Sequence, residues 1–465
     1  MSIATELTAL SNNLSNAYNA IDNKGGTIPA NKNTANLADA INSISGGGSV
    51  VVTNGQIKQY KALSSNIDAN TFVNLLNTVV VGTYANMTTL TSSYNSMKAA
   101  KIGSDKVFVI FRVGANLYGV VCTISGTTTT VGTYVQLASD AQTSSPDTSV
   151  TTLEEDKVFV AYPATDYFPK GIVCTVSGTT VTPGTSVTLL NESATSDGMK
   201  SVALDSGRVM VTHRKGNYIN AMVCTITGTT ITPGTDIQLS NGYVGYNGSS
   251  ITLLDTNKVF VAYRNNNHLY SMVCTISDTT ITPGTETELS TLTYSYDASS
   301  CVTLNSSKVF IAHRGADNAL NGMVCTISGT TITHGADTPL SPYTGSYLNA
   351  SAAALSSNKV FVAHQGGVNS SLGYLYGASC FIEGTSIIIG DYRALDTSSY
   401  ASTSASAVAL DADRVFVVHR KSSYAAGNAC SISDLLATEA TGTIRGLTST
   451  QCTTSTAGDV WVLNS

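Results

Sequence analysis

One sequence motif recurs seven times in this chain at nearly equal intervals. A representative copy is Lys308-Val-Phe-Ile-Ala-His-Arg314, followed after a short gap by Gly322-Met-Val-Cys325. The seven copies begin at Lys106, Lys157, Arg208, Lys258, Lys308, Lys359 and Arg414, at successive distances of 51, 51, 50, 50, 51 and 55 residues. Such a period indicates an array of supersecondary units, none of which can bury its hydrophobic faces alone.

Each repeat predicts four short antiparallel strands, which we call a to d in chain order. In the third repeat these strands are residues 201–204, 208–213, 221–226 and 229–239. Four-stranded units repeated around an axis are the blades of a β-propeller. A string of separate small sandwiches is less favourable, because each would bury too little surface. The sequence therefore predicts an all-β propeller.

The count of strands predicts how the ring closes. Pro183, Pro233 and Pro283 fall in strand d, and proline is tolerated at a sheet edge, so strand d is expected to be the outer one. The first copy of strand d, Thr78–Met87, precedes any strand a, and the last repeat lacks a strand d. We therefore predict that residues 78–434 form a seven-bladed propeller whose last blade takes its outer strand from Thr78–Met87, which removes the open edge.

The rest of the chain is predicted to form two smaller parts. At the start of residues 1–48, apolar residues alternate three and four apart, which predicts a helical segment for attachment or oligomerisation. Residues 49–77 and 435–465 each contain strand patterns but are too short to be stable alone. Because ring closure brings both pieces to the same blade, we expect them to form one small split β module.

Composition limits the partners of the chain. Charged residues make up only 12% of it, the net charge is −6, and lysines and arginines are spread through the repeats. Nucleic acids and anionic membranes attract clustered basic residues, so we expect no nucleic-acid partner and no membrane insertion.

Cysteine usage predicts free thiols. Seven of the nine cysteines occupy one position of strand c, and equivalent positions on adjacent blades are too far apart to bridge. They are expected to act as small buried apolar residues in a chain folded in a reducing cytoplasm. No pair has the spacing of a zinc site and no calcium loop is visible, so we predict no metal and no cofactor.

The two faces of the predicted disc differ. The a–b and c–d turns lie on one face, the turn face, and the b–c and d–a loops lie on the other, the loop face. The loops vary between blades and are rich in Tyr, Ser, Asn and Gly, a composition typical of binding surfaces. The predicted ligand-binding residues are Tyr218, Tyr243, Tyr246, Asn266, His268, Tyr270, Tyr294, Tyr296, Tyr343, Tyr347, Tyr374 and Tyr376. Soluble turns are the alternative interpretation, although turns do not require aromatic residues.

A second set of residues occupies one position at the end of strand b. Its members are Phe111, Tyr162, His213, Tyr263, His313, His364 and His419. Positions related by the ring are too distant to share a metal ion, and we expect no carboxylate to repeat beside them. We therefore expect ring–ring or ring–arginine contacts between neighbouring blades.

Catalysis has little support in the sequence. A glycosidase needs two carboxylates on either side of one bond. Glu154, Asp205, Asp255 and Asp411 fall instead in a–b turns, on the face away from the variable loops. We predict no catalytic residues and no enzymatic activity.

Three segments resemble tail and tail-fibre proteins of phages and prophages from Gram-positive hosts. Lys24-Gly-Gly-Thr-Ile-Pro-Ala30 with Thr34-Ala-Asn-Leu-Ala-Asp-Ala-Ile41 is similar to their N-terminal segment. Ile67-Asp-Ala-Asn-Thr-Phe-Val73 with Thr456-Ala-Gly-Asp-Val-Trp461 is similar to a small β module of the same proteins. The blade motif resembles propeller repeats of phage fibres and bacterial surface proteins.

This resemblance implies a function at the tail of a virion, after synthesis in the bacterial cytoplasm. Residues 1–48 would attach to other tail or baseplate proteins, and the propeller would recognise a host-surface glycan or protein. The coiled-coil spacing predicts a homo-oligomer, with a trimer favoured. Two alternatives remain open, namely a passive structural or decoration protein of the virion and a host-envelope glycosidase.

Overall fold

A computed structural model of the 465-residue chain divides it into two compact units, Met1–Leu75 with Asp434–Ser465, and Leu76–Ser433. The structure describes residues 14–19, 21, 32, 51–53, 56–58, 78–90, 94–143, 148–192, 195–242, 244, 249–266, 268–290, 299–315, 319–341, 348–366, 374–398, 405–421, 424–433, 444–445 and 460–461. Within these ranges, no helix has the length and apolar character needed to cross a membrane.

In the unit formed by the two ends of the chain, the described residues form short elements. Residues 14–19 are helical, β1 (Val51–Thr53) pairs antiparallel with β2 (Gln56–Lys58), and β37 (Ile444–Arg445) pairs parallel with β38 (Val460–Trp461). The coiled coil and the joining of the two β pieces into one module stay predictions.

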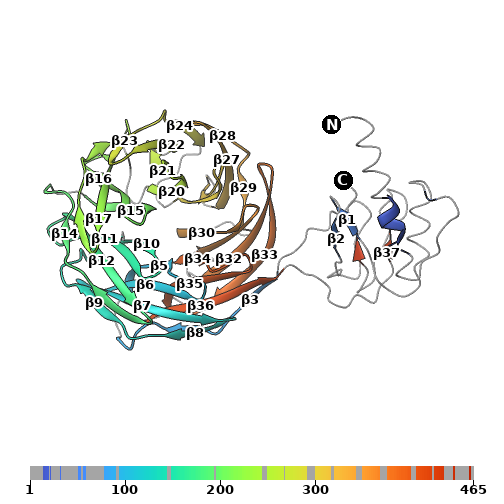
Figure 1. The fold of residues 1–465 in the computed structure, drawn as a ribbon, viewed down its shortest axis with the longest axis horizontal. Coiled ribbons are helices and arrows are strands. Elements are labelled where there is room, and N and C mark those ends of the chain that lie inside the picture. The colour runs from blue at the N-terminus through green and yellow to red at the C-terminus, as the bar shows by residue number, and fades with distance from the viewer. Residues whose placement is uncertain are drawn as a thin grey trace. The chain divides into compact units, whose positions relative to one another are not determined.

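The second unit consists of seven blades, numbered in the order of their inner strands (Figure 1). Strands a are β5 (Tyr94–Lys101), β10 (Ser149–Glu154), β15 (Thr195–Asp205), β20 (Ser249–Asp255), β25 (Ser300–Asn305), β30 (Leu348–Ser356) and β34 (Ser406–Ala409). Strands b are β6 (Lys106–Val113), β11 (Lys157–Pro163), β16 (Arg208–Lys215), β21 (Lys258–Asn265), β26 (Lys308–Arg314), β31 (Lys359–Gly366) and β35 (Arg414–Lys421).

The outer half of each blade consists of strands c and d. Strands c are β7 (Asn116–Ser125), β12 (Pro169–Ser177), β17 (Tyr218–Thr227), β22 (His268–Ser277), β27 (Leu320–Ser328), β32 (Tyr374–Glu383) and β36 (Tyr424–Ser433). Strand d is continuous only in blade 6, as β33 (Ser386–Asp396). Elsewhere it is broken into β8 (Thr128–Val131) and β9 (Val135–Ala138), β13 (Thr180–Pro183) and β14 (Val187–Thr188), β18 (Thr230–Thr232) and β19 (Ile237–Gln238), β23 (Thr280–Thr282) and β24 (Thr287–Ser290), β28 (Thr331–His334) and β29 (Thr338–Pro339), and β3 (Thr78–Val81) and β4 (Ala85–Asn86).

A glycine at each break explains the repeated glycine of strand d. At this point strand d comes close to the backbone of strand c. A Cβ atom at Gly234 would lie 2.3 Å from the carbonyl oxygen of Val223, and one at Gly82 would lie 2.5 Å from that of Ala429. Only glycine allows this approach between two backbones.

The ring closes as predicted. β3 pairs with β36 in the last blade, with Val79 opposite Ile432, and β4 pairs with the same strand. Val79 is fully buried, and its backbone N–H donates a hydrogen bond of 2.9 Å to Asp391 of blade 6. The predicted all-β, seven-bladed propeller with an outer strand supplied from the N-terminal side is therefore confirmed.

Hydroxyl groups join the inner strands of successive blades. The hydroxyl of Ser300 accepts a hydrogen bond of 2.9 Å from the Ala352 backbone N–H, and that of Ser351 accepts one of 2.9 Å from Ala407. Across the closing joint between blades 7 and 1, Ser406 accepts one of 3.2 Å from Ala99. Backbone N–H groups on the free edge of strand a thus find hydrogen-bond acceptors on the preceding blade.

Strand b lies in the middle of each blade. Its third residue has a large buried side chain, which requires a small residue beside it on strand c. A Cβ atom at Gly427 would lie 2.4 Å from Phe416 Cζ, and one at Gly377 would lie 2.4 Å from Phe361 Cζ. In blade 3 the equivalent residues are Met210 and Ala221, both buried. In blades 6 and 7 the phenylalanine thus contacts a glycine, whereas in blade 3 the more flexible methionine contacts an alanine. Blade 4 differs, because Phe260 there has Ser271 at the position of the glycine.

This packing predicts the effect of Gly427→Ala. The added methyl group would also lie 2.7 Å from Met87 Cε, so it has no space and should lower the free energy of unfolding by about 1–3 kcal/mol. Adding Phe416→Met, which copies blade 3, should recover part of the loss in thermal melts followed by circular dichroism. A single variant as stable as the wild type would contradict this account.

Candidate functional site

A set of side chains recurs near the loop-face end of strands c and d in every blade, and we call each set a seam patch. In each patch the second strand-c position pairs directly with the second strand-d position, as in Tyr118 with Gln136 and Asn220 with Gln238, so both side chains lie on one side of the sheet. The strand-c positions are Asn116 and Tyr118, Phe168 and Lys170, Tyr218 and Asn220, His268 and Tyr270, Ala319 and Asn321, Tyr374 and Tyr376, and Tyr424 and Ala426. The strand-d positions are Tyr134 and Gln136, Ser186 and Thr188, Asp236 and Gln238, Glu286 and Glu288, Asp337 and Pro339, Tyr392 and Ala394, and Tyr84 and Asn86.

The seam patches include five of the twelve predicted binding residues. Tyr218, His268, Tyr270, Tyr374 and Tyr376 occupy the strand-c positions of blades 3, 4 and 6, so they belong to three separate patches. A sixth, Asn266, lies in the b–c turn of blade 4 with a positive φ of 47°. The other six lie outside the described residues, namely Tyr243, Tyr246, Tyr294, Tyr296, Tyr343 and Tyr347.

Sequence reasoning missed several tyrosines that the structure places in the same patches. Tyr118 and Tyr134 in blade 1, and Tyr392 in blade 6, are partly exposed, and they lie in seam patches as the predicted residues do. Tyr84 in blade 7 is 51% exposed, and the Lys421 ammonium lies 3.3 Å from the centre of its ring. Tyr84, Tyr134 and Tyr392 share one sequence signal, because each is a variable residue two positions after the repeated glycine of strand d, whereas Tyr118 lies in strand c.

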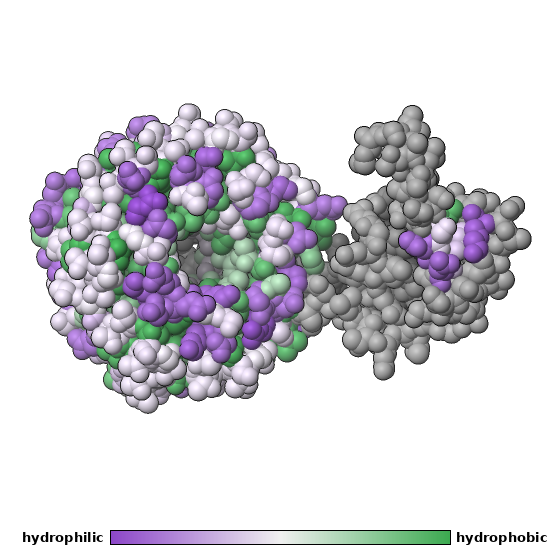
Figure 2. Space-filling view, in the orientation of Figure 1, coloured by the Kyte–Doolittle hydropathy of each residue, from purple (hydrophilic) through white to green (hydrophobic). Residues whose placement is uncertain are grey.

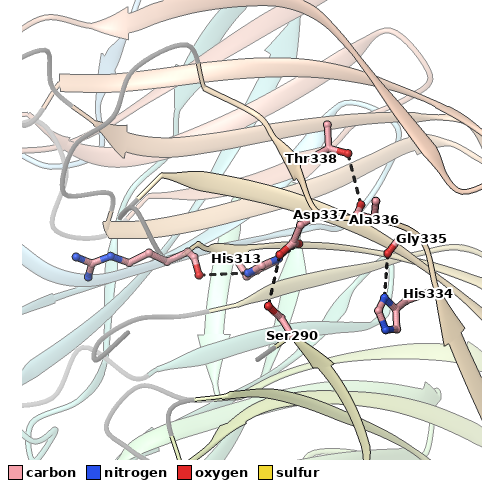
Figure 3. Close-up of polar contacts among 8 residues, drawn as sticks. Ser290, His313, His334, Gly335, Ala336, Asp337 and Thr338 are labelled. Atoms are coloured by element: carbon pink, nitrogen blue, oxygen red, sulfur yellow. Dashed lines mark hydrogen bonds and ion pairs between the residues drawn. The ribbon is translucent and has the colours of Figure 1, made fainter. Parts of the chain in front are cut away.

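The residues at the end of strand b lie beneath the seam patches, and three of the histidines contact carboxylates. His213 Nε2 lies 2.9 Å from Asp236, and His313 Nε2 lies 2.6 Å from Asp337 (Figure 3). In blade 7 the partner of His419 is Asp396 of blade 6, at 3.0 Å. The expectation that no carboxylate accompanies this position was therefore wrong, because the acid comes from strand d or from the preceding blade.

Aromatic contacts occur at the same position in two blades. The His364 ring lies 5.9 Å from Tyr376 and 5.5 Å from Tyr392, and the Phe111 ring lies 5.5 Å from Tyr118. Ring–ring contacts were expected between neighbouring blades, but these lie within a single blade. The cause is the antiparallel pairing of strands b and c, which places each b-end residue directly opposite a strand-c residue of the seam patch.

The buried carboxylates are held ionised by their neighbours. Burial opposes ionisation of Asp236, but its contact with His213 and the hydrogen bond from Asn220 outweigh burial and lower the pKa of Asp236. The pKa of Asp396 is lowered further, because His419 and the backbone N–H of Ser398 outweigh its burial. These pairs fasten adjacent strands and blades together.

The His313 site does not have the geometry of a catalytic triad. Ser290 Oγ lies 3.5 Å from Asp337 Oδ2, whereas His313 contacts the other oxygen of the same carboxylate (Figure 3). A nucleophilic serine needs the imidazole between the hydroxyl and the acid. The site therefore fits a polar junction between blades 4 and 5. Among the described residues, no group of three His, Cys, Asp or Glu side chains could hold a metal ion.

The cysteines in the described part of the chain are buried as thiols. Eight cysteines are free and buried in the described part of the chain, seven of them in strand c. Burial raises the pKa of Cys122, for example, to about 12, and its sulfur lies 3.4 Å from the sulfur of Met87. A thiol in this environment packs as a small apolar group.

No family model matches this chain, and no curated protein matches it. Among solved structures, AofleA from Arthrobotrys oligospora is similar at 11% identity over 68% of this chain and 92% of that chain, with a TM-score of 0.43. A fucose-binding fungal lectin from Aleuria aurantia, which has six blades, is similar at 11% identity over 67% and 99%, with a TM-score of 0.41. The Hadza microbial sialidase Hz136 is similar at 10% identity over 73% and 66%, also with a TM-score of 0.41.

Proposed function

We propose that the propeller binds carbohydrate through its seam patches, and that the chain is a non-enzymatic receptor-binding protein of a virion tail. The observation that carries this proposal is the partial exposure of tyrosines in the patches of five blades. These are Tyr118 and Tyr134, Tyr218, Tyr270, Tyr374 and Tyr392, and Tyr84 and Tyr424.

Tyrosine in this setting suits a sugar ligand. One side of a pyranose ring is apolar and can lie against an aromatic face, while the phenol group and nearby amides bond to its hydroxyls. Some of these rings are held by packing, as Tyr392 is by Tyr376, with ring centroids 5.2 Å apart. Their immobilisation on binding therefore costs little entropy.

The arrangement around the ring favours many weak contacts. Figure 2 shows one face of the disc, with hydrophilic residues along part of the rim of the central opening and weakly hydrophobic ones along another part. The seam patches repeat around the disc, so a polymer on a cell surface could occupy several at once. Linked weak sites raise the overall affinity far above that of each site. Host-surface polysaccharide is thus the ligand that the fold serves best.

The remaining parts of the proposal follow from the tail-like ends of the chain. The N-terminal segment would attach to other tail or baseplate proteins and would assemble the chain as a homo-oligomer, with a trimer favoured. The protein would be synthesised in the bacterial cytoplasm and carried in the tail. A single-chain mass of the full-length protein in light scattering would contradict the oligomer.

Adsorption to cells tests the proposal. Full-length protein should bind to intact Gram-positive cells of the host type, and the double variant Tyr218→Ser with Tyr374→Ser should bind at least about tenfold more weakly, because two exposed aromatic contacts are lost. The control variant, Thr227→Ala with Glu383→Ala, changes exposed residues at the opposite ends of the same strands.

Three results would count against parts of the proposal. If the full-length protein adsorbs to none of the Gram-positive strains tested, a passive decoration protein of the virion is favoured. Release of reducing sugar from the envelope favours a glycosidase. Equal weakening by the control variant would show that the tyrosines are not the contact.

A further inference from the structure

We infer that the seam patch of blade 1 is a binding site for an uncharged pyranose, an assignment that rests on the proposed function and adds the chemical class of the ligand. The patch consists of Asn116, Tyr118, Tyr134 and Gln136, none of which belongs to the residues predicted from the sequence. Its floor is Phe111 at the end of β6, which is fully buried.

The three aromatic rings of this patch form a corner. Tyr118 stacks on Phe111 with ring centroids 5.5 Å apart and an interplanar angle of 18°. Tyr134 meets Tyr118 edge-on, at 5.7 Å and 88°. Both tyrosines are partly exposed, and their two rings lie nearly at right angles. A rigid aromatic corner fits the apolar side and rim of a six-membered ring.

Two side-chain amides lie beside the corner. Gln136 Nε2 donates a hydrogen bond of 3.3 Å to Asn116 Oδ1, and Gln136 is exposed. Each amide carries two donor hydrogens and an acceptor oxygen with two lone pairs, so one shared bond leaves most of this capacity for a ligand. Adjacent hydroxyls of a sugar are both donors and acceptors, and they match such a pair.

The absence of acidic and basic side chains at the four positions of the blade 1 patch sets the class of ligand. Blade 4 has Glu286 and Glu288 at the positions of Tyr134 and Gln136, and other patches contain Asp236, Asp337 or Lys170. Within the described part of the propeller, only the blade 1 patch combines two tyrosines, two amides and no ionisable acid or base at these positions. An anionic or cationic sugar would lose hydration there and gain no opposite charge.

Ligand-observed NMR with full-length protein tests the assignment. The probes are the methyl glycosides of glucose, galactose and N-acetylglucosamine, with sialic acid as the anionic probe and glucosamine as the cationic one. At least one neutral glycoside should bind more tightly than both charged probes. Asn116→Ala with Gln136→Ala should weaken that binding roughly tenfold, because hydrogen bonds to two exposed amides are lost.

The turn-face end of blade 1 supplies the control, because Thr128 of β8 is exposed and lies outside the seam patches. Thr128→Ala should leave glycoside binding unchanged. Gln136→Glu, which introduces the charge of blade 4, should weaken neutral glycosides and leave Tm unchanged. This variant keeps the size of the side chain, so its effect reports on the added charge and the lost amide donors and not on packing.

The outcomes separate the assignment from the proposed function. Neutral glycosides that bind equally well to the double variant would place the sugar elsewhere, and would overturn the assignment while the proposed function stands. Tighter binding of sialic acid or glucosamine would overturn the ligand class. If no glycoside binds and the wild type fails to adsorb to cells, the proposed function fails as well.

Discussion

Phe310→Ala is expected to lower the free energy of unfolding of the propeller by about 3–5 kcal/mol, which is the usual effect of removing a buried phenylalanine ring. Phe310 is fully buried in β26. It belongs to a hydrophobic cluster that joins Leu320 and Leu340 of blade 5 to Val360 and Ala378 of blade 6. Loss of the ring therefore leaves a cavity at a junction between blades, where neither blade can close it alone.

Far-UV circular dichroism during chemical denaturation should measure this effect. The single tryptophan, Trp461, lies in the other unit, so its fluorescence does not report on the propeller. Tyr218→Ala is the matched control, because this side chain is 39% exposed and its removal opens no cavity. An equal loss of stability in both variants would show that the patch tyrosines are packed structure and would weaken the proposed function.

Acidification from pH 7 to pH 4 is expected to destabilise the propeller by about 3 kcal/mol through His364 alone, the energy of a shift of roughly 2.5 pKa units. Burial lowers the pKa of His364 from 6.5 to about 4. Between these values the unfolded chain binds a proton that the folded chain does not, so stability falls as the pH falls. Below pH 4 both states are protonated and the loss is complete.

His364→Phe should remove this step. Blade 1 already has the same arrangement with Phe111, whose ring lies 5.5 Å from Tyr118 and 6.1 Å from Tyr134, so the substitution copies an existing packing. Urea denaturation midpoints of variant and wild type should diverge between pH 6.5 and 4. Identical slopes in that range would contradict the burial of a neutral imidazole.

A second acid-sensitive group acts at lower pH. The pKa of Asp396 is depressed by its contact with His419, so its contribution to stability is present above about pH 4 and is lost as the pH falls further. The two windows do not overlap, which allows the effect of His364 to be measured separately.

The propeller could be predicted from the sequence because the pattern of residues within each repeat predicts the four strands of one blade. The motif that begins at Lys308 marks strands b and c of one blade. Only the last repeat lacked a strand d, so Thr78–Met87 was predicted to supply it, and the pairing of β3 with β36 confirms this. The break in strand d was not predicted. The repeated glycine is visible in the sequence, but the need for it depends on how closely the backbone of strand c, at Val223 and its equivalents, approaches strand d.

The site was harder to predict because it is built across strands. His213 and Asp236 are 23 residues apart, and His419 and Asp396 belong to different blades, so inspection of sequence neighbours did not reveal either pair. The composition of the b–c and d–a loops predicted that binding residues lie in those loops, yet Tyr118 and Tyr134 lie in or beside strands. A better signal is a position that changes while the repeat around it stays constant, as at the residue two after the strand-d glycine.

The closing strand also sets when the protein becomes resistant to proteolysis. Val81 of β3 pairs with Cys430 of β36, roughly 350 residues later in the chain. At about 5–20 residues per second, a ribosome needs roughly 20 to 70 seconds to synthesise the intervening chain. Throughout that time β3 has no partner strand, and blades 1 to 6 emerge one after another into a ring that stays open. Nascent chains should therefore be cleaved readily until the last blade emerges, and become resistant in a single late step.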